Sequence, residues 1–82
     1  MIPVRLLYFA RLAELIGLTA EDLAVPAAID DAGLLRLVAE RHPAATGLLS
    51  RTRVAADQTF VRGPLPIRPG LEIALIPPVS GG

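Results

Sequence analysis

Residues 29–43 read IDDAGLLRLVAERHP and contain the clearest secondary-structure signal in this chain of 82 residues. Leu34 and Val38 fall on one apolar stripe at helical spacing. Asp30 precedes the stripe and is a good N-cap residue, because its side chain can accept a hydrogen bond from the first turn. Pro43 follows it and disfavours helical geometry in the residue before it. The spacing therefore predicts one main helix between Asp30 and Pro43.

Shorter segments on both sides of this helix read as strands and turns. Gly17 can close a short helix in the left-handed conformation, and Asp57-Gln58 reads as a hairpin turn. We predict strands over residues 2–9, 21–25, 53–56, 59–61 and 71–76, and short helices over residues 9–16 and 44–50. Residues 63–70 hold three prolines and two glycines, and we expect them to be irregular. The expected fold class is α+β, a mixed sheet packed on one main helix plus short helices, forming a single domain over residues 1–82.

Two of the predicted strands are apolar on both faces. In the first strand one face carries Val4, Leu6 and Tyr8, and the other carries Arg5, Leu7 and Phe9. In the last strand one face carries Leu71, Ile73 and Leu75, and the other carries Glu72, Ala74 and Ile76. Such a pattern suits central strands whose sheet is covered on one side and used for contact on the other.

The composition excludes several classes of function. Eight acidic residues balance eight arginines, and the absence of a basic excess makes nucleic-acid binding a poor expectation. The sequence holds no lysine and no cysteine, which rules out a lysine Schiff base and thiolate or disulfide chemistry on this chain. We expect no bound metal, since the single His42 without cysteine makes a poor site. No apolar run is long enough to span a bilayer and no signal peptide is recognisable, so we expect no membrane partner and a cytoplasmic location.

The end of the sequence, residues 77–82, reads PPVSGG and predicts a flexible C-terminal tail. Two prolines end the strand ladder and favour an extended exit. Terminal glycines give a thin backbone that can enter a narrow channel and leave the carboxylate of Gly82 unshielded. That carboxylate is ionised and unreactive at neutral pH, so chemistry there needs activation by another enzyme. Many chains also end in glycine or serine without any role, and the inert tail stays open as an alternative.

Three stretches of the sequence resemble the small subunit of molybdopterin synthase, a family of ubiquitin-like sulfur carriers. They are VRLLYFARLAELIG at residues 4–17, ADQTFV at residues 56–61 and EIALIPPVSGG at residues 72–82. The resemblance covers nearly the whole chain, and the terminal motif is its most specific part. Two positions depart from the family pattern: Leu71 replaces an acid that often precedes the last strand, and Asp57 replaces a frequent asparagine.

The resemblance implies a β-grasp fold and a function at the last residue. Gly82 would be adenylated by an E1-like enzyme that uses ATP, and a sulfur-donating enzyme would convert the adenylate into a thiocarboxylate. The tail would then enter the large subunit of molybdopterin synthase, in a heterotetramer, and give its sulfur to a cyclic pterin precursor. The tail residues implied in that insertion are Pro77, Pro78, Val79, Ser80 and Gly81. The chain would bind no cofactor of its own and would be no enzyme alone, but the sulfur-donating part of a sulfurtransferase complex.

The resemblance also implies an apolar docking patch for the partner, formed by Phe9, Phe60 and Ile76. Strand parity places Phe9 and Ile76 away from the expected core. The alternative is that both phenylalanines are ordinary core residues. Three other functions stay open at this point: a carrier for thiamine or another sulfur pathway, a protein modifier joined to target lysines through Gly82, and a β-grasp interaction domain with an inert tail.

Overall fold

A computed structural model describes residues 1–79 of the chain. The sites predicted at Ser80, Gly81 and Gly82 lie outside the described residues. The elements in chain order are β1 (Ile2–Tyr8), α1 (Ala10–Ile16), β2 (Ala20–Val25), α2 (Asp31–Arg41), the 3₁₀ turn η1 (Pro43–Ala45), α3 (Thr46–Leu49), β3 (Arg53–Ala56), β4 (Thr59–Phe60) and β5 (Glu72–Ile76). Every strand and helix predicted from the sequence is therefore present in the described residues.

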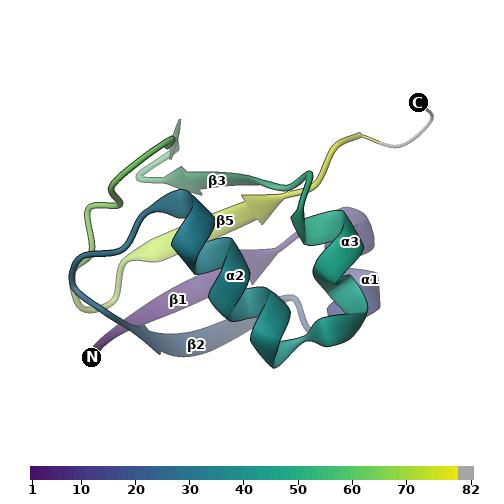
Figure 1. The fold of residues 1–82 in the computed structure, drawn as a ribbon, viewed down its shortest axis with the longest axis horizontal. Helices are drawn as coiled ribbons and strands as arrows, with labels where there is room; N and C mark the ends of the chain where they lie inside the picture. Colours follow the sequence, from purple (N-terminus) through teal and green to yellow (C-terminus); the bar gives the residue numbers. More distant parts are fainter. Residues whose placement is uncertain (80–82) are drawn as a thin grey trace.

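The strands form one mixed sheet in the order β2-β1-β5-β3-β4. The first and last strands, β1 and β5, lie side by side and run parallel, and the other neighbouring pairs are antiparallel. Figure 1 shows β5 in the middle of the sheet, pointing toward the C-terminal end of the chain. Two chain segments that are remote in sequence thus form the centre of the fold.

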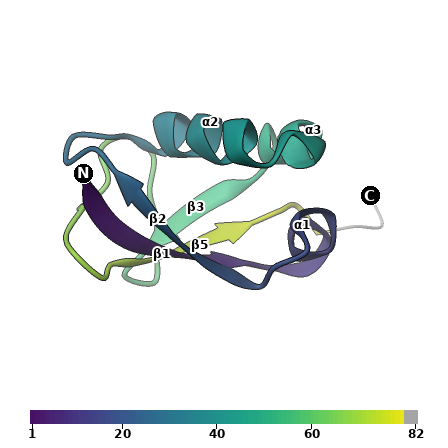
Figure 2. The same ribbon diagram turned by 90° about the horizontal axis from the view of Figure 1, so that it is seen from below.

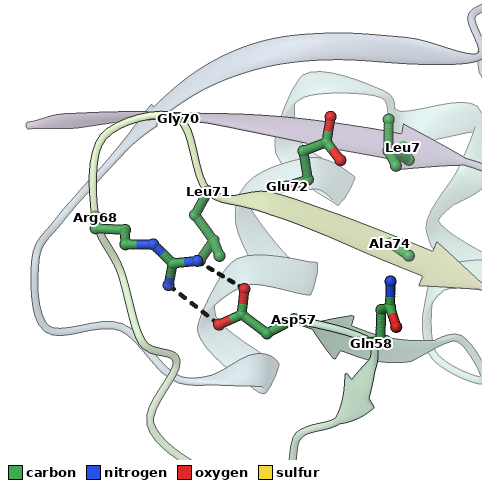
Figure 3. Close-up of a pocket in the computed structure, with 9 residues that line it drawn as sticks. Leu7, Asp57, Gln58, Arg68, Gly70, Leu71, Glu72 and Ala74 are labelled. Atoms are coloured by element: carbon green, nitrogen blue, oxygen red, sulfur yellow. Dashed lines mark hydrogen bonds and ion pairs between the residues drawn. The ribbon is translucent and has the colours of Figure 1, made fainter.

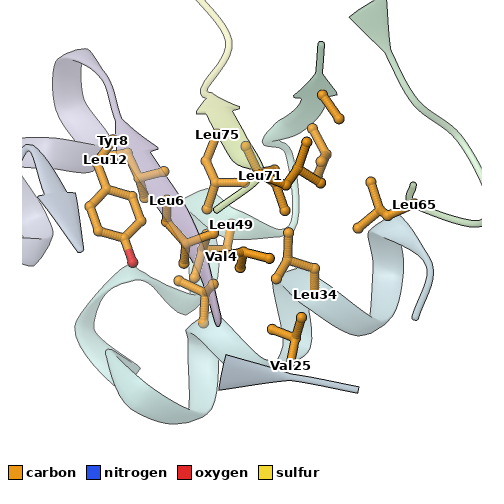
Figure 4. Packing of buried hydrophobic residues seen from close by; sticks show 14 of the residues in the cluster. Val4, Leu6, Tyr8, Leu12, Val25, Leu34, Leu49, Leu65, Leu71 and Leu75 are labelled. Atoms are coloured by element: carbon orange, nitrogen blue, oxygen red, sulfur yellow. The ribbon is translucent and has the colours of Figure 1, made fainter. Parts of the chain in front are cut away.

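The main helix α2 crosses one face of the sheet, and within the described residues no helix covers the other face (Figure 2). The core lies between these two layers, as the packed side chains in Figure 4 show. Its largest fully buried side chains are Leu6, Leu12, Leu34, Leu49, Ile73, Leu75, Val4, Val25 and Val38. Val4, Leu6 and Tyr8 from β1 all point into this core, as strand alternation predicted.

The first turn of α2 is capped as predicted. The Asp30 carboxylate accepts a hydrogen bond of 2.7 Å from the backbone N–H of Gly33. A Cβ atom at Gly33 would lie 3.0 Å from the Asp30 carboxylate and 3.1 Å from the Ile29 side chain. The glycine therefore leaves room for the cap. The αL conformation of Gly17, with φ of 84°, closes α1 as expected.

Several boundaries differ from the predicted ones by a residue. Phe9 ends no strand; its carbonyl accepts the amide of Leu12 at 3.1 Å and so begins α1. Leu71 precedes β5, because its amide bonds the Arg68 carbonyl in a turn while its own carbonyl accepts from Arg5 at 2.8 Å. The hairpin strand predicted to reach Val61 ends at Phe60. The predicted helix over residues 44–50 is split into η1 and α3.

Candidate functional site

The chain leaves the domain from the centre of the sheet. β5 ends at Ile76, and Pro77 after it is still buried. Pro78 is exposed, and Val79 retains 94% of its accessible surface. The described part of the predicted tail therefore becomes exposed at Pro78, one residue later than the boundary predicted at residue 77, because Pro77 packs against the domain. The insertion of these residues into a partner stays a prediction.

Phe9 lies beside this exit. Tyr8 at the end of β1 pairs with Leu75 of β5, so the next residues along the two parallel strands, Phe9 and Ile76, are adjacent in register. Ala10 has φ of 50°, a left-handed conformation that is uncommon for alanine, and it turns the chain from β1 into α1. Phe9 remains 46% exposed, and Ile76 is partly buried. Both point away from the core, as strand parity predicted.

Phe60 is presented by a short hairpin at the other edge of the same face. Asp57 and Gln58 form its turn with φ of 52° and 64°, the backbone of a two-residue hairpin loop. The Arg68 guanidinium donates two hydrogen bonds to the Asp57 carboxylate, at 2.6 and 3.1 Å, and so ties the irregular 63–70 segment to this turn. Phe60 retains 47% of its accessible surface. The alternative that both phenylalanines are core residues is therefore wrong.

A row of small and apolar side chains connects Phe9 and Ile76 with Phe60. Leu7 pairs with Ala74, Ala74 with Ala55, and Ala55 with Phe60 across four adjacent strands. One step nearer the exit, Ile76 pairs with Arg53. We call this surface the open-face patch, and it consists of Leu7, Phe9, Ala55, Phe60, Ala74 and Ile76. The structure thus places Phe9, Phe60 and Ile76 on one surface. Strand alternation had already put Leu7 with Phe9 and Ala74 with Ile76, and sequence reasoning missed only that Ala55 joins them.

A shallow hollow of about 540 Å³ continues the open-face patch at the end far from the chain exit. Leu7, Ala55 and Ala74 line it together with the polar groups of Asp57, Gln58, Arg68 and Glu72 (Figure 3). Its rim is polar because the Asp57–Arg68 ion pair stands at its edge. The hydrogen bonds from Arg68 hold the pKa of Asp57 below its usual range. The hollow is a recess in a contact surface, since its floor is the sheet itself.

A second polar cluster, on the covered side of the sheet, joins β2 to the end of α2. The Glu21 carboxylate accepts hydrogen bonds from the Tyr8 hydroxyl at 2.7 Å and from Arg41 Nε at 3.0 Å. His42 Nε2 lies 2.7 Å from the same carboxylate, and its ring meets the Tyr8 ring edge-on at 6.1 Å. No local sequence pattern indicates this cluster, because Glu21 and His42 are 21 residues apart and meet only through the packing of α2 on the sheet.

This cluster has shifted protonation equilibria with a clear physical cause. Burial disfavours the charged carboxylate of Glu21, but the hydrogen bonds from His42, Tyr8 and Arg41 outweigh it and lower the pKa of Glu21 to about 2. Burial, and then the neighbouring carboxylate, raise the pKa of Tyr8 above its ordinary value. Within residues 1–79 no buried side-chain nitrogen or oxygen lacks a hydrogen-bond partner. The cluster is therefore best explained as a clamp that fixes the end of α2 to the sheet.

For residues 1–79, a metal site and a membrane-spanning helix can be assessed directly. No three histidine, cysteine or acidic side chains gather there in a way that could hold a metal ion. None of the helices described is long and apolar enough to cross a membrane. The feature that stands out is the open-face patch beside the chain exit, a flat apolar surface of the kind that binds another protein.

The fold and this surface define a class of protein. A mixed five-stranded sheet with one main helix across one face is the ubiquitin-like β-grasp, as predicted. The chain matches the crystal structure of SAMP1 from Haloferax volcanii with a TM-score of 0.80 and 25% identity, over 98% of this chain and 99% of that one. It also matches a complex of subunits 1 and 2 of the molybdopterin-converting factor from Helicobacter pylori, with a TM-score of 0.70, 21% identity and coverage of 99% and 100%.

Sequence comparison narrows the class to a family. The ThiS family model matches residues 6–82, and the chain belongs to the ThiS family. The human molybdopterin synthase sulfur carrier subunit is 38% identical over 88 residues, with all of both chains covered. The protein of the same name from Caenorhabditis briggsae is 32% identical over 84 residues, again with all of both chains covered. The resemblance found in the sequence motifs is thereby confirmed.

Proposed function

We propose that this protein is the sulfur carrier subunit of a molybdopterin synthase and that it works in the cytoplasm through the carboxylate of Gly82. The observation that carries the proposal is the position of the open-face patch. Phe9 and Ile76 lie on an exposed sheet face at the point where the chain leaves the domain. A partner that covers this face also receives the residues that follow. The names of the full-length relatives support the same function.

The proposed chemistry takes place on the terminus and needs other proteins. The Gly82 carboxylate attacks ATP on an E1-like enzyme, which forms the acyl adenylate and releases pyrophosphate. A sulfur-donating enzyme then supplies sulfur at the sulfide level, which attacks the acyl carbon, breaks its bond to AMP and leaves a thiocarboxylate. The large subunit takes up the tail, residues Pro77 to Gly81. The thiocarboxylate sulfur bonds to the pterin precursor, and water then cleaves the acyl–sulfur bond and restores the Gly82 carboxylate. The large-subunit partner is supported by the Helicobacter pylori complex of two converting-factor subunits.

Intact-mass analysis of the protein from its native host tests this chemistry. The proposal requires a fraction of molecules that end at Gly82 and carry one sulfur in place of one oxygen. When Gly81 and Gly82 are removed, we expect both this fraction and molybdopterin synthesis to be lost. A product with residues beyond position 82, or full cofactor synthesis by the truncated chain, would contradict the proposal.

A protein modifier is the second candidate, because SAMP1, whose structure resembles this chain, is named a small archaeal modifier protein. The same cells distinguish the two functions. Conjugates of this chain to lysines of other proteins favour the modifier, and the thiocarboxylate without conjugates favours the carrier. Neither product, with activity unaffected by the truncation, leaves only an interaction domain. A carrier for thiamine or another sulfur pathway is distinguished by which synthesis fails when the gene is deleted.

Substitution of Phe60 by aspartate tests the docking surface. We expect Phe60→Asp to weaken binding to the purified large subunit at least about tenfold, because it buries a charge in an apolar contact. The monomer should stay folded, since Phe60 is half-exposed. Ala32→Asp is the matched control, as it adds the same charge to the exposed side of α2. Titration calorimetry and thermal unfolding measure the two properties, and an unfolded Phe60→Asp variant would mean that Phe60 supports the core instead.

A further inference from the structure

One charged side chain is built into the open-face patch. The Cζ atom of Arg53 lies over the Phe60 ring, 3.8 Å from its centroid, within the range of a cation–π contact. Arg53 is also the cross-strand partner of Ile76, the last residue of β5. Arg53 is exposed to solvent, but its guanidinium is held on the sheet face between the hairpin and the chain exit.

Arg53 has no acidic partner within residues 1–79, whereas three other arginines near the sheet do. Arg5 pairs with Asp22 at 3.1 Å, Arg41 with Glu21 at 3.0 Å, and Arg68 with Asp57 at 2.6 Å. Within residues 1–79 the Arg53 guanidinium makes neither an ion pair nor a side-chain hydrogen bond. The ring of Phe60 holds the group in place and leaves its N–H donors for another molecule.

The charged side chains of this face lie at the two ends of the apolar row. Glu72, at the start of β5, lies at the rim of the hollow far from the exit, whereas Arg53 pairs with Ile76 at the end of the same strand. The apolar row of Leu7, Ala74 and Ala55 lies between them. A partner that covers the patch therefore meets the Arg53 charge next to the chain exit, whereas at the opposite end Glu72 stands beside Arg5 and the Asp57–Arg68 ion pair.

We propose that Arg53 recognises a carboxylate of the large subunit beside the entrance for the tail, and that this contact selects the cognate partner. The inference rests on the proposed function and specifies its partner surface. When the patch is covered and water leaves, a guanidinium without a counter-charge is costly, whereas a carboxylate can accept two of its N–H donors in parallel. Because Phe60 already restrains the side chain, less conformational entropy is lost on binding.

Binding of three charge variants to the purified large subunit tests this recognition. Arg53→Leu keeps the apolar contact and loses the charge, so we expect about tenfold weaker binding and a weaker dependence on salt. Arg53→Glu places two carboxylates together and should weaken binding about 100-fold. Arg36→Glu is the matched control, because Arg36 is exposed on α2, in the other layer of the molecule. The affinity of this variant for the large subunit should stay within about twofold of that of the unchanged chain.

A reciprocal exchange identifies the carboxylate. One acidic residue of the large subunit, changed to arginine, is expected to restore binding of Arg53→Glu and to weaken binding of the unchanged chain. The inference is overturned if Arg53→Leu binds as tightly as the unchanged chain with the same salt dependence, while Phe60→Asp still weakens binding at least about tenfold. If the unchanged chain does not bind the large subunit at all, the proposed function fails together with it.

Discussion

At the scale of single residues, strand alternation builds the open-face patch, whereas the contacts of Arg53 with Phe60 and of His42 with Glu21 come from packing between elements. Strand alternation was enough to place Phe9 and Ile76 on the outer face, because the side-chain period of a strand is two. It could not pair Arg53 with Phe60, since that contact depends on the register of the hairpin and on a side-chain rotamer. Nor could it bring His42 to Glu21, which required the position of α2 on the sheet. Contacts between distant residues follow from packing and not from local pattern.

The Glu21 clamp leads to a prediction about acid stability. The pKa of Glu21 is lowered from 4.5 to about 2 in the folded chain. A group whose pKa is lower in the folded state stabilises the fold above its unfolded pKa, and the contribution is lost as the pH falls toward the folded value. We therefore expect the free energy of unfolding to fall between pH 4.5 and 2. Solvent around the half-exposed Arg41 screens its ion pair with Glu21. The contribution of Glu21 to the free energy of unfolding is therefore limited to about 1–2 kcal/mol.

Glu21→Gln isolates this contribution. The variant should be less stable than the unchanged chain at pH 6 and should lose less stability on acidification. Urea unfolding at several pH values, followed by circular dichroism, measures both. Glu40→Gln, on the exposed side of α2, controls for the loss of one negative charge. If the free energy of unfolding depended on pH in the same way for Glu21→Gln and for the unchanged chain, Glu21 would not be the cause of the loss of stability in acid.

At the scale of elements, the sequence predicted every strand and helix, and the errors lie at their ends. The prediction of α2 was the most secure, because the N-cap residue, the apolar stripe and the terminating proline all indicate the same helix. The ends of β1 and β5 were less certain, because the Phe9 carbonyl begins α1, and the Leu71 amide bonds the Arg68 carbonyl in the turn before β5. The structure gives Gly33, in the first turn of α2, a steric role, because a Cβ atom there would crowd the Asp30 cap.

That role of Gly33 reverses the usual expectation for glycine in a helix. Replacement by alanine normally stabilises a helix by about 1 kcal/mol. Here the new Cβ would stand 3.0 Å from the Asp30 carboxylate and displace the capping group. We expect Gly33→Ala to destabilise the chain by about 1 kcal/mol, the usual value of an N-cap. Thermal unfolding measures the change.

A double-mutant cycle checks the steric cause. In an Asp30→Ala background the cap is already absent and the collision with its carboxylate is gone. Gly33→Ala should then cost less than it does alone, or even stabilise the helix. Equal effects in both backgrounds would assign the cost to Ile29, whose side chain would also lie close to the new Cβ, at 3.1 Å.

At the scale of the whole molecule, the strand order was beyond the reach of local patterns. Hydrophobic alternation indicated a mixed sheet on one main helix, and only the resemblance to a known family supplied the β-grasp. The parallel pairing of β1 with β5 joins residues from the two ends of the chain, so no short-range signal encodes it. This pairing places the chain exit beside Phe9 and thereby creates the candidate site.

The two faces of the sheet should therefore be separable by mutation. Leu34, on the face covered by α2, is fully buried, and Leu34→Ala should cost about 2–5 kcal/mol of stability. The Leu34→Ala variant keeps the open-face patch unchanged. Its folded fraction should therefore bind the large subunit with unchanged affinity at low temperature. Phe60→Asp should show the opposite pair of results. Unfolding curves combined with binding measured well below the melting temperature test both variants. If Leu34→Ala lowered the affinity of its folded fraction as strongly as Phe60→Asp does, the covered and open faces would not act independently.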